Sequence, residues 1–208
     1  MGLIYSHKES DDSVIAVWEI TESIDELLKS VRLDEDETKT LATFLHSKRK
    51  KEWLATRCLL QHLPVYINET IRYNKDGKPF LSNKANISIS HSSGYVALIV
   101  HEKALVGIDI QTPKTNIKKG SQLFMSPAEQ KELGELNSFD KLHIYWCAKE
   151  ALYKYAGIKE LNLYSDLTID NFSFEIKGKI TGQIKKSNLK IKLNYFYNKF
   201  YYLVYTSS

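Results

Sequence analysis

A central amphipathic helix, predicted from about Ser138 to Ala156, places the strongest constraint on how this chain can fold. Gly157 follows it and is typical of a helix C-terminal cap. A helix with one continuous apolar stripe needs a second layer to cover that stripe. On a period of 3.6 residues, the stripe is made by Ile144, Ala148, Ala151, Leu152 and Tyr155.

The polar edge of this helix carries Glu150 and Lys154, one turn apart. One interpretation is a solvated i,i+4 ion pair that contributes about 0.2–0.5 kcal/mol. The other is chemical and needs partners, because a carboxylate that binds a divalent cation requires further oxygen ligands and a lysine that meets phosphate requires other donors nearby. Candidates for both kinds of partner occur upstream.

Strand and helix patterns alternate along the chain and predict an α+β fold. A β-rich run at 14–20 precedes a helix capped by Ser23, and one long helical region is predicted from 34 to 63. Asp76-Gly77 favours a tight hairpin turn, and Ser126-Pro127 predicts a helix start. Further strands are expected at 71–74, 78–81, 87–90, 95–100, 104–111, 170–177, 179–184, 189–196 and 200–205.

The composition of the 208 residues excludes several classes of protein. With 43% hydrophobic residues the chain can bury a core, and it has no run of about 18 apolar residues and no apolar signal segment. We therefore expect a cytoplasmic protein without a membrane partner. Cys58 and Cys147 lie in helical patterns without ligand spacing and are expected to be buried free thiols. The net charge of +4 suits anionic ligands or an acidic protein and is too small to require nucleic acid.

Asp109 and Gln111 share one face of the predicted strand 104–111, whose other face buries Val106, Ile108 and Ile110. Two side-chain oxygens at i and i+2 are suited to part of a Mg²⁺ site. An edge strand with a polar face is the alternative.

Basic and polar residues upstream are candidates for phosphate contacts. Arg49, Trp53 and Arg57 recur every fourth residue, so two guanidinium groups can flank one aromatic ring. His91 follows Ser90 at the end of a strand, where backbone donors are close. The plainer alternatives are a solvated charged face and a structural histidine.

Four motifs in this order resemble those of the 4′-phosphopantetheinyl transferase superfamily. The resemblance covers most of the chain from about 47 to 157 and is to the larger, surfactin-synthetase-activating type. It implies two similar α+β halves, 1–102 and 103–208, related by a pseudo-twofold axis with the active site in the cleft between them. The motifs are Gly77-Lys78-Pro79, Ser88-Ile89-Ser90-His91-Ser92, Gly107-Ile108-Asp109-Ile110-Gln111 and Trp146 to Lys154.

The activity implied by the resemblance is that of a holo-carrier-protein synthase. Such an enzyme transfers the 4′-phosphopantetheine group of coenzyme A to a serine of an apo acyl or peptidyl carrier protein, and it releases 3′,5′-ADP. Mg²⁺ is the expected metal, and a monomer is the expected state. Which carrier protein is served depends on surface complementarity and is left open.

The resemblance also implies roles for individual residues. Asp109 and Glu150 would hold the metal, with Gln111 as a weaker ligand where many relatives have a glutamate. Glu150 would help to deprotonate the serine, and Lys154 would neutralise the pyrophosphate or protonate its leaving oxygen. Contacts with coenzyme A are implied for Arg49, Arg57, Lys78, Ser90, His91, Lys149 and Lys154.

Two other functions fit parts of the sequence. The basic runs at 48–51 and 185–186 are compatible with a nucleic-acid or anion-binding module on the same fold without catalysis. That module would lack the interleaved exposed aromatics of single-strand binders. A Mg²⁺-dependent phosphohydrolase acting on nucleotides is the third hypothesis.

Overall fold

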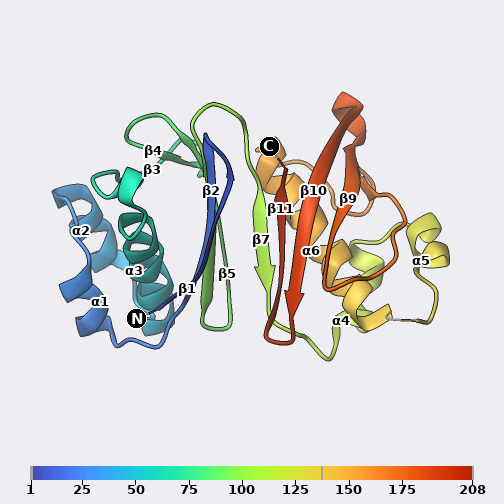
Figure 1. Cartoon of the computed structure of the whole chain (residues 1–208), viewed down its shortest axis with the longest axis horizontal. Helices are drawn as coiled ribbons and strands as arrows, with labels where there is room; N and C mark the ends of the chain where they lie inside the picture. Colours follow the sequence, from blue (N-terminus) through green and yellow to red (C-terminus); the bar gives the residue numbers. More distant parts are fainter. Residues whose placement is uncertain (1, 137, 208) are drawn as a thin grey trace.

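The computed structural model describes residues 2–136 and 138–207, which form two antiparallel sheets lying next to each other (Figure 1). The first sheet has the order β1-β2-β6-β5-β4-β3 and the second the order β7-β11-β10-β9-β8. The strands of the first sheet are β1 (Leu3–Ser10), β2 (Ser13–Glu19), β3 (Ile71–Tyr73), β4 (Pro79–Leu81), β5 (Asn86–Ser92) and β6 (Tyr95–His101). Those of the second are β7 (Ile108–Gln111), β8 (Leu167–Ile169), β9 (Lys177–Ile184), β10 (Leu189–Asn198) and β11 (Tyr201–Thr206).

Each sheet is covered on its outer face by one long helix. The helix α3 (Ser47–Gln61) packs on β2 and β6, and α6 (Ser138–Ala156) packs on β7 and β11 (Figure 1). The remaining helices lie further out and are α1 (Ile24–Ser30), α2 (Glu35–Thr43), α4 (Ile117–Gly120) and α5 (Pro127–Leu133). The fold therefore combines helices and sheets as predicted, while a pseudo-twofold relation and the division after residue 102 stay predictions.

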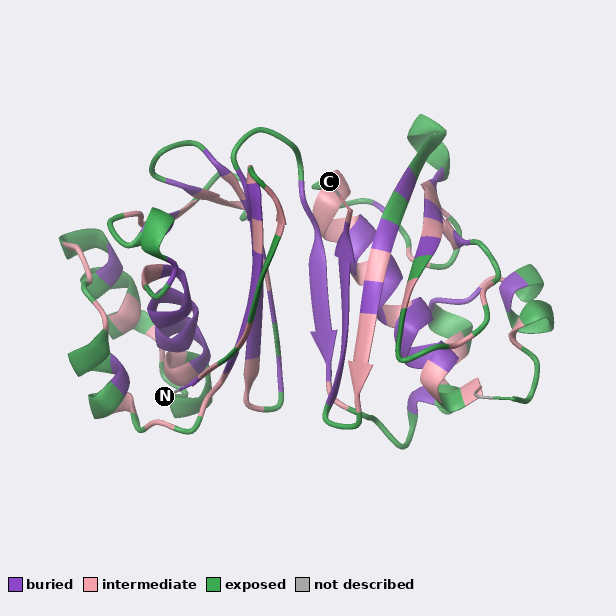
Figure 2. Cartoon of the chain, in the orientation of Figure 1, coloured by how far each residue is buried: buried purple, intermediate pink, exposed green. Residues whose placement is uncertain are grey.

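The two sheets share a core through their inner faces, and Figure 2 shows the facing strands as buried. Apolar side chains from both sheets pack together there, so each half depends on the other for burial of its inner face. The contributors from the first sheet are Ile15, Val17, Ala97 and Ile99, and those from the second include Ile108, Ile110, Tyr201, Leu203 and Tyr205.

Local sequence signals account for the helix starts. Ser23 and Ser126 each accept a hydrogen bond from the backbone of the third helical residue, and the glutamates at those positions, Glu26 and Glu129, bond back to the cap. Both capping boxes satisfy amide groups that a helix start leaves free. These starts, the bounds of α6 and the Asp76-Gly77 turn confirm the sequence predictions.

Four predictions of secondary structure differ from the structure. The strand expected at 104–111 forms only as β7 (Ile108–Gln111). The long helical region from 34 to 63 is broken at 44–46 into α2 and α3, because Phe44 adopts an extended conformation and ends α2. The expected strand at 170–177 is replaced by the shorter β8 at Leu167–Ile169. The strand β1 was missed because it is a partly exposed edge strand whose sequence, LIYSHKES, lacks a clear apolar alternation.

Serine side chains of β5 attach the edge strand β7 to the first half of the chain. The alternation of a strand places Ser88, Ser90 and Ser92 on one face. The hydroxyl of Ser88 accepts a hydrogen bond from the Ile108 amide at 3.1 Å, and that of Ser92 accepts one from the Thr112 amide at 3.1 Å. An edge strand has unpaired backbone groups, and these serines satisfy one of them in β7 and the amide that directly follows the strand.

Gly107 allows β7 to lie directly against the backbone of α6. A β-carbon at this position would collide with the carbonyl oxygen of Ala151. The glycine is therefore required by the close approach of two main chains. This approach brings Asp109 next to the polar edge of α6.

We predict that Gly107→Ala destabilises the protein by about 1–3 kcal/mol, because a methyl group there must displace β7 or α6. Urea unfolding measures the free energy difference. Gly120→Ala is the matched control, since a β-carbon at Gly120 meets no atom within 4 Å. Equal unfolding midpoints for the two variants would contradict the packing argument.

Candidate active site

The centre of the candidate site is Asp109, which lies on β7 and faces α6. Its Oδ1 accepts hydrogen bonds from Lys154 Nζ at 2.7 Å and from Ser90 Oγ at 2.6 Å. Lys154 Nζ also donates to the Ile108 carbonyl at 3.0 Å. The second oxygen, Oδ2, is buried and finds no nitrogen or oxygen donor among residues 2–136 and 138–207, while the buried thiol of Cys147 interacts with the same carboxylate. A buried carboxylate oxygen without a partner is costly, so it offers a place for a cation.

Glu150 lies close enough to Asp109 for their charges to interact. Burial raises the pKa of Glu150, and the negative charge of Asp109 raises it further, while Lys154 and Lys114 act in the opposite direction. Two carboxylates in a partly dehydrated site disfavour each other's ionised form. A divalent cation would remove this conflict, so the donor set fits a metal ion.

Gln111 completes this face of β7. Its Nε2 donates to Ser92 Oγ at 3.0 Å, and its amide oxygen makes no hydrogen bond to the residues that the structure describes, so it can accept from or coordinate a ligand. In the part of the chain that the structure describes, no three His, Cys, Asp or Glu side chains gather as a metal cluster. Any metal site here would thus rest on two carboxylates and a neutral amide.

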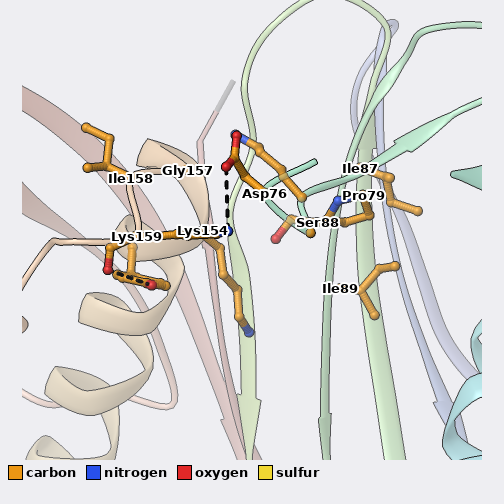
Figure 3. A pocket seen from close by; sticks show the side chains of 12 residues that line it. Asp76, Pro79, Ile87, Ser88, Ile89, Lys154, Gly157, Ile158 and Lys159 are labelled. Carbon is orange, nitrogen blue, oxygen red and sulfur yellow. Dashed lines mark hydrogen bonds and ion pairs between the residues drawn. The ribbon is translucent and has the colours of Figure 1, made fainter. Parts of the chain in front are cut away.

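A cavity of about 170 Å³ lies between the β3–β4 hairpin, β5 and the end of α6 (Figure 3). In Figure 3, Pro79, Ile87 and Ser88 line one side of it, and Ile158 and Lys159 line the other. Lys154 and Lys78 are also in its wall. Lys78 Nζ donates to the Tyr155 carbonyl at 3.1 Å, and burial lowers its pKa. Two lysines therefore contribute to one half-enclosed space.

A second, wider hollow of about 660 Å³ joins the start of α3 to the end of β5 and the segment after β7. Arg49 Nη1 lies 3.0 Å from His91 Nε2 on its wall. Lys48 and Lys114 add further positive charge. This hollow, which we call the basic groove, is defined by His46, Lys48, Arg49, Glu52, His91, Ser92, Ser93, Gln111 and Lys114.

The structure corrects the expectation that Lys149 contacts coenzyme A. Its side chain is 0% exposed, and its ammonium group donates to Glu129 Oε2 at 2.7 Å and to the Phe124 and Leu163 carbonyls. All three protons of the ammonium are used. Helical periodicity places Lys149 beside Glu150 but does not reveal that α5 covers it.

Arg57 was also predicted wrongly as a coenzyme A contact. It is 3% exposed, donates from Nε to Glu37 at 2.9 Å and stacks on the Trp53 ring. Arg49 turns away from this pair and lies over Phe44 at the basic groove. Of the two arginines that the sequence places one above the other, Arg57 is therefore structural and Arg49 is accessible to a ligand.

Ser90 has a different task from the predicted contact with coenzyme A. It is 6% exposed, and its hydroxyl proton is donated to Asp109. This bond holds the carboxylate in place and leaves Ser90 little access to a ligand.

His143 was missed by the sequence analysis because it looks like an ordinary member of the helix. It is fully buried, its Nε2 accepts a hydrogen bond from the Lys114 amide at 2.8 Å, and Nδ1 lies 2.8 Å from the Phe139 carbonyl. Its ring stacks on Tyr202. The backbone of Lys114, at the rim of the basic groove, is thereby anchored to α6.

A comparison with family models gives one finding for this chain. Residues 105–203 match the model of the 4′-phosphopantetheinyl transferase superfamily. The matched segment, just under half of the chain, belongs to this superfamily. The matched segment includes β7 and α6, which carry Asp109, Glu150 and Lys154.

Other comparisons add limits to this assignment. No curated protein matches the chain. Membership of the surfactin-synthetase-activating type stays a prediction, because the match begins after the first sheet. Among the described helices, none has both the length and the apolar character needed to cross a membrane.

Lys149→Met is predicted to destabilise the protein by about 3–5 kcal/mol, because Glu129 would lose its buried partner. Chemical denaturation followed by circular dichroism measures the change. Lys131→Met, at an exposed position of α5, is the control and should change stability by no more than about 0.5 kcal/mol. An unchanged midpoint for Lys149→Met would show that the buried pair is dispensable.

His143 should make stability depend on pH. Burial lowers its pKa below the ordinary value near 6.5, so the unfolded chain binds the extra proton more readily than the folded one. The contribution of His143 to the free energy of unfolding is complete above about pH 6.5. Below that pH it declines by up to about 1.4 kcal/mol per pH unit, down to the folded-state pKa. In His143→Gln, whose amide oxygen can still accept from Lys114, this decline should disappear. Parallel stability curves for wild type and variant between pH 7.5 and 5 would refute the assignment.

Proposed function

We propose that this protein transfers the 4′-phosphopantetheine group of coenzyme A to a serine of an apo acyl or peptidyl carrier protein, leaving 3′,5′-ADP. The observation that carries the proposal is the meeting of Asp109, Glu150 and Lys154 where β7 approaches α6. Membership of the 4′-phosphopantetheinyl transferase superfamily supports the reaction class.

The reaction forms a bond from the serine oxygen to the phosphorus of the pantetheine phosphate and breaks the pyrophosphate bond. Glu150 would accept the serine proton as the general base. Lys154 would neutralise charge on the departing 3′,5′-ADP. No protein nucleophile is required, because alignment and charge stabilisation lower the barrier.

Asp109 and Glu150 would hold Mg²⁺, with Gln111 as a neutral third donor. When bound, the ion supplies positive charge to the phosphate oxygens. In its absence Lys154 neutralises Asp109 at 2.7 Å. A site with two carboxylates in place of three carries less negative charge, so we expect it to bind Mg²⁺ more weakly.

The pyrophosphate and the 3′-phosphate of coenzyme A each have a candidate position. Lys78 and Lys154 share the smaller cavity and suit the pyrophosphate. His91 and Arg49 in the basic groove suit the 3′-phosphate, and Lys114 adds charge at the rim. We further propose that the enzyme is a cytoplasmic monomer.

The direct test is a mass assay with coenzyme A, Mg²⁺ and a panel of apo carrier proteins. Transfer adds one phosphopantetheine to the carrier, and no addition to any carrier by the folded protein would contradict the proposal. Nucleotides incubated without a carrier distinguish a phosphohydrolase, which would release phosphate from them.

Glu150→Gln should lower turnover by about 10²–10⁴-fold, because the amide can neither accept the proton nor carry the charge. The folded state should be as stable as wild type or slightly more so, since a partly buried carboxylate near Asp109 is removed. Initial rates of holo-carrier formation measure the effect. Glu160→Gln, an exposed position beyond the end of α6, is the matched control. Turnover near wild type in Glu150→Gln would exclude this carboxylate from the mechanism.

A further inference from the structure

The basic groove contains one acidic side chain, Glu52, which none of the roles above uses. Glu52 lies on α3 and is 6% exposed. Its Oε2 is 3.4 Å from His91 Nδ1, and its Oε1 is 3.9 Å from Lys48 Nζ. A buried carboxylate in a groove meant for phosphate needs an explanation, because like charges repel.

The position of Glu52 behind His91 provides the explanation. The imidazole stands between two charged groups, with Glu52 at Nδ1 and Arg49 at Nε2. A guanidinium can only donate hydrogen bonds, so Nε2 must accept from Arg49. The proton of the neutral ring therefore lies on Nδ1 and faces the carboxylate.

In this state His91 has no proton to offer a ligand in the groove. A second proton on Nε2 would create a donor beside the guanidinium of Arg49, and both could then bond to one phosphate. Glu52 would neutralise the imidazolium from the opposite side. The carboxylate thus favours the charged ring that a phosphate needs.

We propose that Glu52 is a positioning residue that holds His91 for protonation on Nε2 when the 3′-phosphate of coenzyme A enters the basic groove. The inference rests on the proposed function, because it takes coenzyme A as the ligand. Glu52 itself would not touch the phosphate.

The charges around His91 agree with protonation on binding. Burial lowers the pKa of His91, the charge of Glu52 raises it, and Arg49, Lys154 and Lys48 lower it. Lys114 adds positive charge from the segment after β7. Because burial and these cations outweigh one carboxylate, the ring favours its neutral form until a phosphate shifts the balance.

A positioning role for Glu52 and simple charge repulsion predict opposite effects of Glu52→Gln on coenzyme A binding. Repulsion alone predicts that removing the carboxylate tightens binding of coenzyme A. The positioning role predicts that binding weakens by about tenfold, since a charge-assisted hydrogen bond to phosphate is lost. Titration calorimetry measures the affinities for coenzyme A and for 3′-dephospho-coenzyme A. The substitution should change only the affinity for coenzyme A.

Proton uptake is the second measurement. At pH 7.5, titrations in two buffers with different ionisation enthalpies should show that wild type takes up more protons with coenzyme A than with its 3′-dephospho form. The difference should vanish in Glu52→Gln and in His91→Asn, whose position is accessible enough to tolerate substitution. Glu35→Gln, exposed on α2, should behave as wild type.

These outcomes separate the inference from the function on which it rests. Unchanged or tighter coenzyme A binding by Glu52→Gln, or proton uptake that persists in it, overturns the role of Glu52. If Glu52→Gln does not fold, His91→Asn provides the test. Proton uptake in His91→Asn equal to that of wild type would then overturn the role of Glu52. Failure of wild type to bind coenzyme A at all would instead contradict the proposed function.

Discussion

The site depends on how the short strand β7 is held between two neighbours. On one side the serine hydroxyls of β5 bond to its backbone and to Asp109, and on the other Gly107 lets it touch the main chain of α6. Hydrogen bonds fix its position along β5, and steric fit fixes its distance from α6. The strand carries acidic and amide oxygens of the site, so the same contacts that join the halves also build the chemistry.

Two lysines on α6 show how packing divides residues of one type into different roles. Lys149 points into the second half, where Glu129 and two carbonyls occupy its ammonium. Lys154 points toward β7 and remains partly exposed beside Asp109. Buried charges require such partners, whereas a charge at the edge of a cavity can exchange one partner for a ligand.

Much of the fold was predictable because local rules determine it. The bounds of α6, the capping boxes at Ser23 and Ser126 and the Asp76-Gly77 turn follow from side chains within a few residues of one another. The edge strand β1 and the break between α2 and α3 were not predicted, because β1 lacks a clear apolar alternation and the extended conformation of Phe44 has no signal in the helical period. Among the site residues, the motifs led us to expect Asp109 and Glu150 near each other. The structural contacts of Ser90, Lys149 and Arg57 were not expected.

By itself the sequence determined most of the element types, the alternation that separates Asp109 from the core face of its strand, and the polar edge with Glu150 and Lys154. Each of these depends only on the period of a helix or strand. The tertiary structure decided which polar side chains are accessible. Burial of Arg57 beneath Glu37, of Lys149 beneath α5 and of Glu52 behind His91 arises where segments far apart in sequence pack together. Solvation and partner choice are properties of those contacts and cannot be read from spacing along one segment.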